Sequence, residues 1–341
     1  MGTRKTPGVY ITEINAFPNS AVAVESSIPA FIGYTEKAIY LNKSYVNKPL
    51  RITSFIEFEM YFGKNCQTLY DLSLAKQETK YENSFDFIIN NFGYEIIQVR
   101  ETKFNLYNSV RFFYQNGGEV MYIISIGTYE NTSDKKVFSD PAIFKKAIDL
   151  LKNEEEPTLL VIPETVLFDS PDCNTIQEYM LAHCGKAKNK FAILDIHDGF
   201  KNLDDADNNP VKNFRYQITS QYLSYGAAYY PWVNTNIIDS SEISFKNLTK
   251  EARLTLEEIC EDAFINLINE KKQKITSALE SLLASDDVMD EADLKAIHET
   301  LMTLIPGYKS VMEAISEQEN LLPPSGGIAG VYTFVDKSRG V

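Results

Sequence analysis

Three side chains that can bind a metal or move a proton follow a predicted strand in the run LDIHDG: Asp195, His197 and Asp198. Binuclear phosphoesterases place metal ligands in this way, but holding two cations needs several further His and Asn ligands on later loops. The chain has only two other histidines, His183 and His298. We therefore favour a turn built from Asp and Gly, and keep an α/β hydrolase or phosphotransfer enzyme using the carboxylates near Asp195 as the alternative.

Two further stretches invite a chemical interpretation. The run PPSGGIAG is rich in glycine, but no Lys follows it and the next residues favour a strand over Gly330 to Val335, whereas a phosphate-binding loop opens a helix. His183 and Cys184 are neighbours on a predicted helix, so they point about 100 degrees apart and cannot form a nucleophile and base pair. We expect both to pack in the core. The sequence thus predicts a protein that is not an enzyme, with no catalytic residue, no metal site and no cofactor.

The elements that carry these side chains alternate between strand and helix. Thr53 or Ser54 caps the start of one predicted helix, which ends at Gly63. Ser139 or Asp140, followed by Pro141, caps the start of another. Alternation at this spacing predicts an α/β fold with a mainly parallel sheet and helices on both faces. The predicted strands are 28–35, 120–126, 158–164, 191–199 and a strand that ends at Pro231, and the main helices are 55–62, 106–114, 141–151 and 170–188.

Three segments stand apart from this core. An N-terminal strand arm occupies residues 1–22, because Val9 and Ile11 alternate with Tyr10 and Thr12 behind a Pro-Gly pair. Residues 64–104 are less regular and predict a small insertion. Residues 241–320 predict a helical hairpin, with one helix from Leu256 to Leu283 and a second from Leu294 to Ile315. The core is then discontinuous, over 23–63, 105–240 and 321–341.

Composition excludes several classes of protein. A net charge of −14 disfavours nucleic-acid binding, because carboxylates repel phosphates. No apolar run approaches the roughly 18 residues that span a bilayer, so we expect no direct membrane contact. The four cysteines are far apart and indicate reduced thiols in a protein made in the cytoplasm. They are Cys66, Cys173, Cys184 and Cys260.

Six separated segments together resemble the sheath proteins of contractile tails, and most closely those of phage-tail-like extracellular injection systems. In chain order they are TPGVYITE, FIGYT, SVRFFYQNGGEVMYIISIG, LLVIPE, AAYYPW and PPSGGIAGVYTFVDKSRGV. In this family the final Arg-Gly-Val is followed by a Trp-Lys-Ala-Pro stretch and a long further segment. The resemblance therefore implies that the C-terminal part of the family core is missing from this sequence, which ends at Val341.

The resemblance also implies a function. The chain would be a structural, virion-like component that polymerises as a helical homo-oligomer around an inner tube and contracts to drive the tube through a target envelope. Its partners would be itself, the inner tube protein, and baseplate and tail terminator components. Assembly would take place in the cytoplasm, and a released particle would be extracellular. The expected inter-subunit contact is the strand arm made of Thr6, Pro7, Gly8, Val9, Tyr10, Ile11, Thr12, Glu13 and Ile14.

Overall fold

A computed structural model describes residues 27–75, 85–89, 91–132, 137–204, 209–263 and 291–339. The arm residues from Thr6 to Ile14 lie outside this part of the chain, so the arm stays a prediction. No helix within the described ranges has the length and apolar character needed to cross a membrane.

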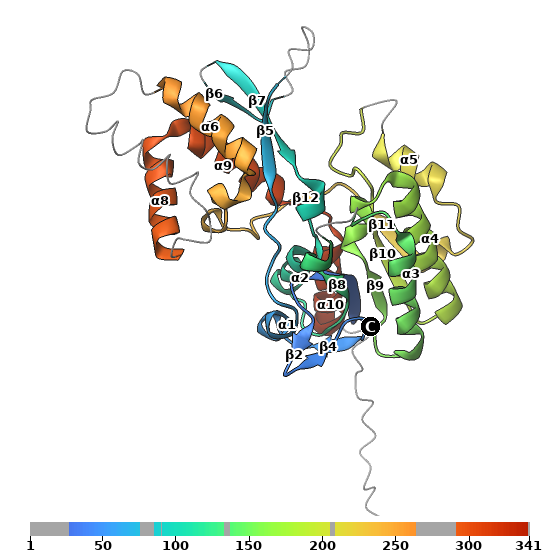
Figure 1. Cartoon of the computed structure of the whole chain (residues 1–341). Coiled ribbons are helices and arrows are strands. Elements are labelled where there is room, and N and C mark those ends of the chain that lie inside the picture. Colours follow the sequence, from blue (N-terminus) through green and yellow to red (C-terminus); the bar gives the residue numbers. More distant parts are fainter. Residues whose placement is uncertain are drawn as a thin grey trace, which may run out of the picture.

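The centre of the molecule is a six-stranded sheet with the strand order β11-β10-β9-β1-β8-β4 (Figure 1). Every neighbouring pair is parallel except β4 with β8, which is antiparallel at one edge. The mainly parallel sheet that the sequence predicts is confirmed. Its strands are β1 (Pro29–Thr35), β4 (Leu50–Ile52), β8 (Met121–Thr128), β9 (Leu159–Val161), β10 (Phe191–Asp195) and β11 (Gly226–Tyr229).

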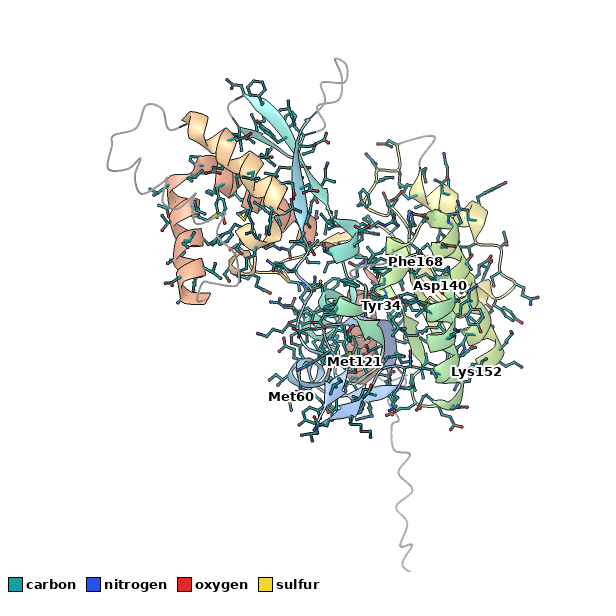
Figure 2. The ribbon with its side chains drawn as sticks, viewed as in Figure 1. Tyr34, Met60, Met121, Asp140, Lys152 and Phe168 are labelled. Carbon is teal, nitrogen blue, oxygen red and sulfur yellow. The ribbon has the colours of Figure 1, made fainter. Side chains whose placement is uncertain are left out.

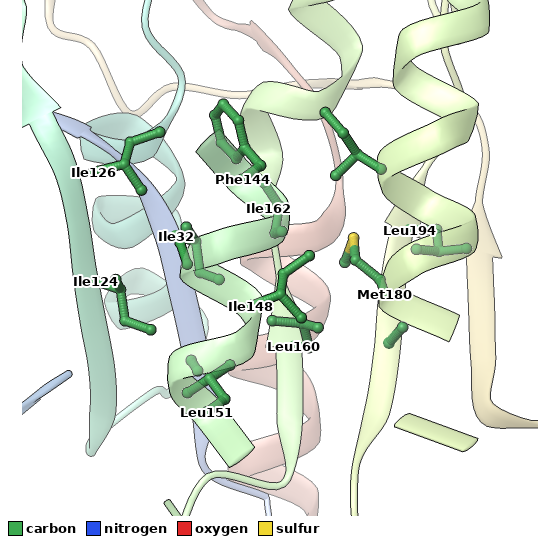
Figure 3. Close-up of a cluster of buried hydrophobic side chains, with 14 of the residues drawn as sticks. Ile32, Ile124, Ile126, Phe144, Ile148, Leu151, Leu160, Ile162, Met180 and Leu194 are labelled. Carbon is green, nitrogen blue, oxygen red and sulfur yellow. The ribbon is translucent and has the colours of Figure 1, made fainter. Parts of the chain in front are cut away.

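Helices cover both faces of this sheet, as predicted. Alternate side chains of β1 point to opposite faces, so Ile32 packs toward α3 and α4 whereas Phe31 packs toward α2. Figure 3 shows the first of these two layers, in which Ile148 and Met180 lie over the strands. The helices of that face are α3 (Pro141–Leu150) and α4 (Ser170–Ala187), and those of the other are α1 (Phe55–Phe62), α2 (Leu106–Gln115) and α10 (Ser325–Arg339).

Two of these helices, α1 and α3, begin where local sequence signals predict. The Ser54 hydroxyl accepts the backbone N–H of Glu57 at 3.2 Å and caps α1. The Asp140 carboxylate accepts the N–H of Ala142 at 2.9 Å, and Pro141 occupies the first turn of α3. Of the two candidates predicted for each cap, the second is the one that caps the helix.

The predicted strand from Gly330 to Val335 is wrong, because these residues belong to α10. Valine and aromatic residues favour strands weakly, and tertiary packing overrides that preference. Here the glycines of α10 let it lie close against α2. An added Cβ would lie 2.5 Å from the Ser109 carbonyl oxygen at Gly326, and 2.4 Å from the Phe113 carbonyl oxygen at Gly330.

A second group of elements, which we call the accessory unit, combines the described residues of 69–103 with those of 236–320 (upper left in Figure 1). The segment that the sequence predicts to be irregular contains an antiparallel sheet, and helices pack on it. Their buried side chains, among them Tyr70, Ile96, Leu256 and Tyr308, form one hydrophobic cluster. The strands are β5 (Tyr70–Leu74), β6 (Phe87–Ile89) and β7 (Phe92–Gln98), and the helices are α6 (Lys250–Ala263), α8 (Glu291–Leu304) and α9 (Pro306–Glu319).

The single helix predicted from Leu294 to Ile315 is also wrong. Ile305 has extended backbone angles and Pro306 begins a new helix, so the segment forms α8 and α9. Proline lacks the N–H that a helix interior needs. The predicted partner helix is described as far as Ala263, and its expected continuation to Leu283 lies outside the described residues.

Smaller elements complete the described chain. A short hairpin precedes α1, α5 follows β10, and an antiparallel pair joins the two ends of the segment that contains α6 to α9. These elements are β2 (Ile39–Tyr40), β3 (Lys43–Ser44), α5 (Pro210–Gln217), β12 (Val233–Asn234) and β13 (Leu321–Leu322).

Candidate functional site at the carboxyl edge of the sheet

The three side chains of LDIHDG do not form one site. Asp195 ends β10, and its carboxylate accepts the Ser325 N–H at 2.8 Å and the Ser325 hydroxyl at 2.5 Å. The ring Nε2 of His197 lies 3.0 Å from the Phe168 carbonyl oxygen. Asp198 pairs with Lys201 at 2.6 Å, and its carboxylate also lies 3.7 Å from the His197 Nδ1 atom. The side-chain contacts of Asp195 therefore lie on α10, whereas the side chains of His197 and Asp198 make theirs in loops.

A cavity of about 200 Å³ lies beside His197 and Asp198. Asp195 is not part of its lining, so the carboxylate that the enzyme alternative needs does not face this space. Within the described residues, no group of three or more His, Cys, Asp or Glu side chains is arranged to hold a metal ion. The other lining residues are Ser170, Asn174, Pro210, Asn213, Phe214 and Gln217.

Asp195 is almost fully buried, with 2% of its surface exposed. Burial raises the pKa of its carboxyl group to about 7, and the two hydrogen bonds from Ser325 act in the opposite direction. Ser325 is the first residue of α10, so the carboxylate satisfies a backbone N–H that the helix itself leaves unpaired. The arrangement gives Asp195 a structural role, namely to fix the start of α10 to the end of β10.

Glu164 plays the same role for α2, and sequence reasoning missed it. This fully buried residue follows β9, in the short 3₁₀ turn Pro163–Leu167. Its Oε2 accepts the Tyr34 N–H at 3.0 Å, and the backbone N–H groups of Asn105 and Leu106 also donate to the carboxylate. Burial raises its pKa to about 8, while these three donors lower it.

The approach of Glu164 to β1 depends on a glycine. A Cβ added to Gly33 would lie 2.7 Å from the Glu164 Oε2 atom, so a larger residue there would displace the carboxylate. Tyr34, the next residue, packs its ring on Phe144, which also contacts Phe168, with centroid distances of 6.2 Å and 5.4 Å. Figure 2 shows Tyr34 and Phe168 close to Asp140 at the beginning of α3. Aromatic rings therefore cover this edge of the sheet.

Both carboxylates share one geometry. Each follows the carboxyl end of a parallel strand, and each binds the N-terminus of a helix on the same face of the sheet, where the helix dipole favours negative charge. The only sequence signal for Glu164 is an acidic residue directly after the buried run of LLVIP. Its partners lie 130 and about 60 positions away, so no local pattern could have identified them.

Cys184 packs in the core, as predicted, whereas His183 is buried beside it but also lines a cavity. Both are buried on α4, and burial lowers the pKa of His183 to about 4 and raises that of Cys184 to about 12. The imidazole is therefore neutral and the thiol protonated near pH 7. The glycines of PPSGGIAG likewise contact α2 and form a helix-packing surface.

Comparisons with known proteins show a loose similarity in structure. No family model and no curated protein match the sequence. Among solved structures, the chain is similar to one in a cryo-EM structure of the anti-feeding prophage (AFP) baseplate in contracted state, with 19% identity and a TM-score of 0.41. The match covers 70% of this chain and 50% of that one, so this chain spans about half its length. A similarity this low does not carry a function to the chain.

Proposed function

We propose that this chain is a structural sheath subunit of a contractile injection apparatus. It polymerises as a helical homo-oligomer around an inner tube and contracts to drive that tube through a target envelope. The proposal rests on the six sequence segments that resemble contractile tail sheath proteins. Its partners are then other copies of the chain, the tube protein, and baseplate and terminator components.

The place of those segments in the fold supports the proposal. Five of the six fall in the sheet core, on β1, on α2 and β8, on β9, on β11 and on α10. The buried carboxylates tie them together, since Glu164 of LLVIPE binds Tyr34 of FIGYT and Asp195 binds Ser325 of PPSG. The residues behind the resemblance therefore build one packed body rather than a substrate site. This convergence is the observation that carries the proposal.

A packed body of this kind suits a subunit that moves as a unit. In the proposed mechanism each core is a rigid block, and the arm from Thr6 to Ile14 pairs with strands of neighbouring copies. One such link is weak, because six backbone hydrogen bonds give roughly 6 kcal/mol net. Ordering six residues costs on the order of 6 to 12 kcal/mol. Many links must therefore act together, with added burial of Val9 and Ile11, and no cofactor is needed because free energy is stored at assembly.

The direct test is electron microscopy of cells that express this protein, alone and together with an inner tube protein and baseplate components. Hollow striated cylinders in either case would support the proposal. Deleting residues 1–14 should leave a folded monomer by circular dichroism and abolish the cylinders. Discrete particles in both experiments would contradict the sheath role. Cylinders that persist without residues 1–14 would contradict the role of the arm.

A further inference from the structure

A cavity of about 450 Å³ lies at the amino edge of the sheet, opposite the edge that carries the buried carboxylates. It is formed where α3 and α4 end, against the loops that lead into β9 and β10. Figure 2 shows Lys152 beyond this end of α3, with Asp140 at the other end of the helix. A cavity of this size can hold a small organic molecule.

Two side chains of its lining are buried and keep hydrogen-bonding capacity. His183 on α4 is 6% exposed, and its Nε2 atom has no hydrogen-bond partner among the described residues. Lys190, also 6% exposed, donates from Nζ to the carbonyl oxygens of Glu154 and Pro157 at 2.7 Å and 2.6 Å. An ammonium group has three N–H donors, so these bonds hold Nζ in place and leave one donor. Both side chains can therefore donate to a molecule in the cavity.

The charges around His183 favour an anion. Burial, and then the ammonium group of Lys190, lower the pKa of the imidazole to about 4. Lys152 and Lys186 lower it further, whereas one carboxylate, that of Asp149, raises it. Because Asp149 lies 2.9 Å from the Lys152 Nζ atom, these two charges offset each other. Lys186 and Lys190 remain as the unbalanced charges near the imidazole.

The negative groups of the lining act elsewhere. Glu154 and Glu155 raise the pKa of Lys190, which burial lowers, and they are not among the charges that shift His183. The carbonyl groups at the end of α4 add negative potential, which Lys186 in its last turn offsets. Lys186 is also exposed, so an ion can enter from solvent on its side. An anion is therefore best placed beside His183, between the two lysines.

We propose that this cavity binds the phosphate group of a small molecule, with Lys186, Lys190 and the His183 imidazole as its donors. A phosphate monoester has three terminal oxygens that accept hydrogen bonds, one for each donor, whereas a carboxylate has two. The Tyr179 side chain also lines the cavity and offers the rest of the molecule an aromatic surface. The inference is independent of the proposed function.

Nuclear magnetic resonance tests the binding with inorganic phosphate as the probe. The chain has three histidines, His183, His197 and His298, so their ring signals can be assigned by single substitutions. At constant ionic strength, phosphate should shift the signals of His183 and leave those of the other two unchanged, with a Kd on the order of 1 mM. Glycerol phosphate should bind at least as tightly, and acetate about threefold more weakly or less.

Two lysine variants test the position of the site while His183 stays in place as the reporter. Lys186→Ala removes an exposed charge of the lining and should weaken phosphate binding about three- to fivefold. Lys146→Ala is the matched control, because Lys146 is an exposed residue of α3 outside the lining. It should leave the Kd unchanged, although it alters the net charge of the protein by the same amount.

Three outcomes would overturn the proposal. Equal shifts of the His183 signals with phosphate, acetate and chloride would show a general response to anions rather than a phosphate site. Unchanged His183 signals at about ten times the expected Kd would show that the cavity does not bind phosphate. Equal Kd values for the Lys186→Ala and Lys146→Ala proteins would place any bound phosphate away from Lys186.

Discussion

Ser325 donates both its backbone N–H and its hydroxyl group to the carboxylate of Asp195, although the two residues are 130 positions apart. The contact joins the end of β10 to the beginning of α10, and the whole accessory helical segment lies between them in the sequence. The carboxylate on which the enzyme alternative depends therefore holds together two distant parts of the chain.

Removing that carboxylate should destabilise the fold. Asp195→Ala deletes the acceptor of two hydrogen bonds and leaves the buried Ser325 groups unpaired. We expect a loss of about 2 to 4 kcal/mol in the free energy of unfolding, measured by urea titration. Asp198→Asn is the control, because its carboxylate makes only exposed or long contacts, an ion pair with Lys201 and a 3.7 Å approach to the His197 Nδ1 atom. We expect its loss to cost less than about 1 kcal/mol. An Asp195→Ala protein as stable as the wild type would refute the structural role.

The two buried carboxyl groups should make stability depend on pH. In the folded protein the pKa values of Asp195 and Glu164 are raised to about 7 and about 8, above the ordinary values of 3.8 and 4.5. The folded state then binds more protons than the unfolded state between these values, so their contribution to stability is present at low pH and is lost as the pH rises toward 8. Each group contributes a slope of at most about 1.4 kcal/mol per pH unit.

Glu164→Gln isolates one of these contributions. Glutamine keeps an oxygen that accepts N–H groups but does not titrate, so the decline of stability with rising pH should become shallower between pH 5 and 8. His183 acts in the opposite direction, because its pKa is lowered to about 4 and its neutral form gains stability as the pH rises to 6.5. The measurement is therefore the urea midpoint of the wild type and of the variant at each pH, and the difference between them isolates Glu164. If the two midpoints changed in parallel with pH, Glu164 would not titrate in this range.

The contact between α2 and α10 should not tolerate a methyl group. Gly330→Ala would place a Cβ within 2.4 Å of the Phe113 carbonyl oxygen, a backbone atom that cannot move aside without shifting α2. We expect a loss of about 1 to 3 kcal/mol, despite the higher helix propensity of alanine. Ser338→Ala, at an exposed position of the same helix, should change the melting temperature little. A Gly330→Ala protein that melts higher than the wild type would mean that the helices are not in close contact.

The accessory unit contains a buried ion pair that offers another test. The Lys103 Nζ lies 3.0 Å from the Glu319 Oε2 atom, and the Tyr70 hydroxyl donates to the other oxygen at 2.5 Å. Lys103→Met leaves the Glu319 charge buried without its cation and should cost about 3 to 5 kcal/mol. Adding Glu319→Gln removes that charge, so the double variant should recover a large part of the loss. Additive effects in this double-mutant cycle would contradict a direct pairing.

Local signals account for the parts of the fold that the sequence predicts well. The caps at Ser54 and Asp140 act within three residues, and the buried runs of β1 and β8 are typical of parallel strands. These local patterns were sufficient to predict the α/β core and the helices on both faces of its sheet. The start of α9 also had a local signal, because Pro306 interrupts the helical pattern.

The remaining parts depend on contacts between distant residues. The valine and aromatic residues after Gly330 favour a strand, and only the packing of the glycines on α2 explains why they form a helix. The strands β5, β6 and β7 look irregular in the sequence because the helices that cover them come more than 150 residues later. Glu164 and Asp195 were distinguishable as structural residues only once Tyr34 and Ser325 were seen to bind them.

The last prediction concerns how the accessory unit can be removed. Its small sheet and its helices share one cluster of buried side chains, so deleting residues 236–319 alone would expose the apolar face of β5 and β7. We expect that single deletion to yield aggregated protein. Deleting residues 70–98 as well should leave a soluble core, because the residues that flank each deletion are already hydrogen-bonded to each other. The Val99 N–H donates to the Leu69 carbonyl oxygen at 2.8 Å, and the Thr235 N–H donates to the Asn320 carbonyl oxygen at 2.8 Å.

Each cut can be closed with a short loop. An Asn-Gly pair joining Thr235 to Asn320 would turn β12 and β13 into a hairpin, and three glycines would join Leu69 to Val99. Size-exclusion chromatography and thermal melting of the two deletion proteins measure the outcome. If the single deletion were soluble and as stable as the double one, the small sheet and the helices would not depend on each other. If the double deletion failed to fold while the full chain folds, the accessory unit would be an integral part of the core rather than a separate body packed beside it.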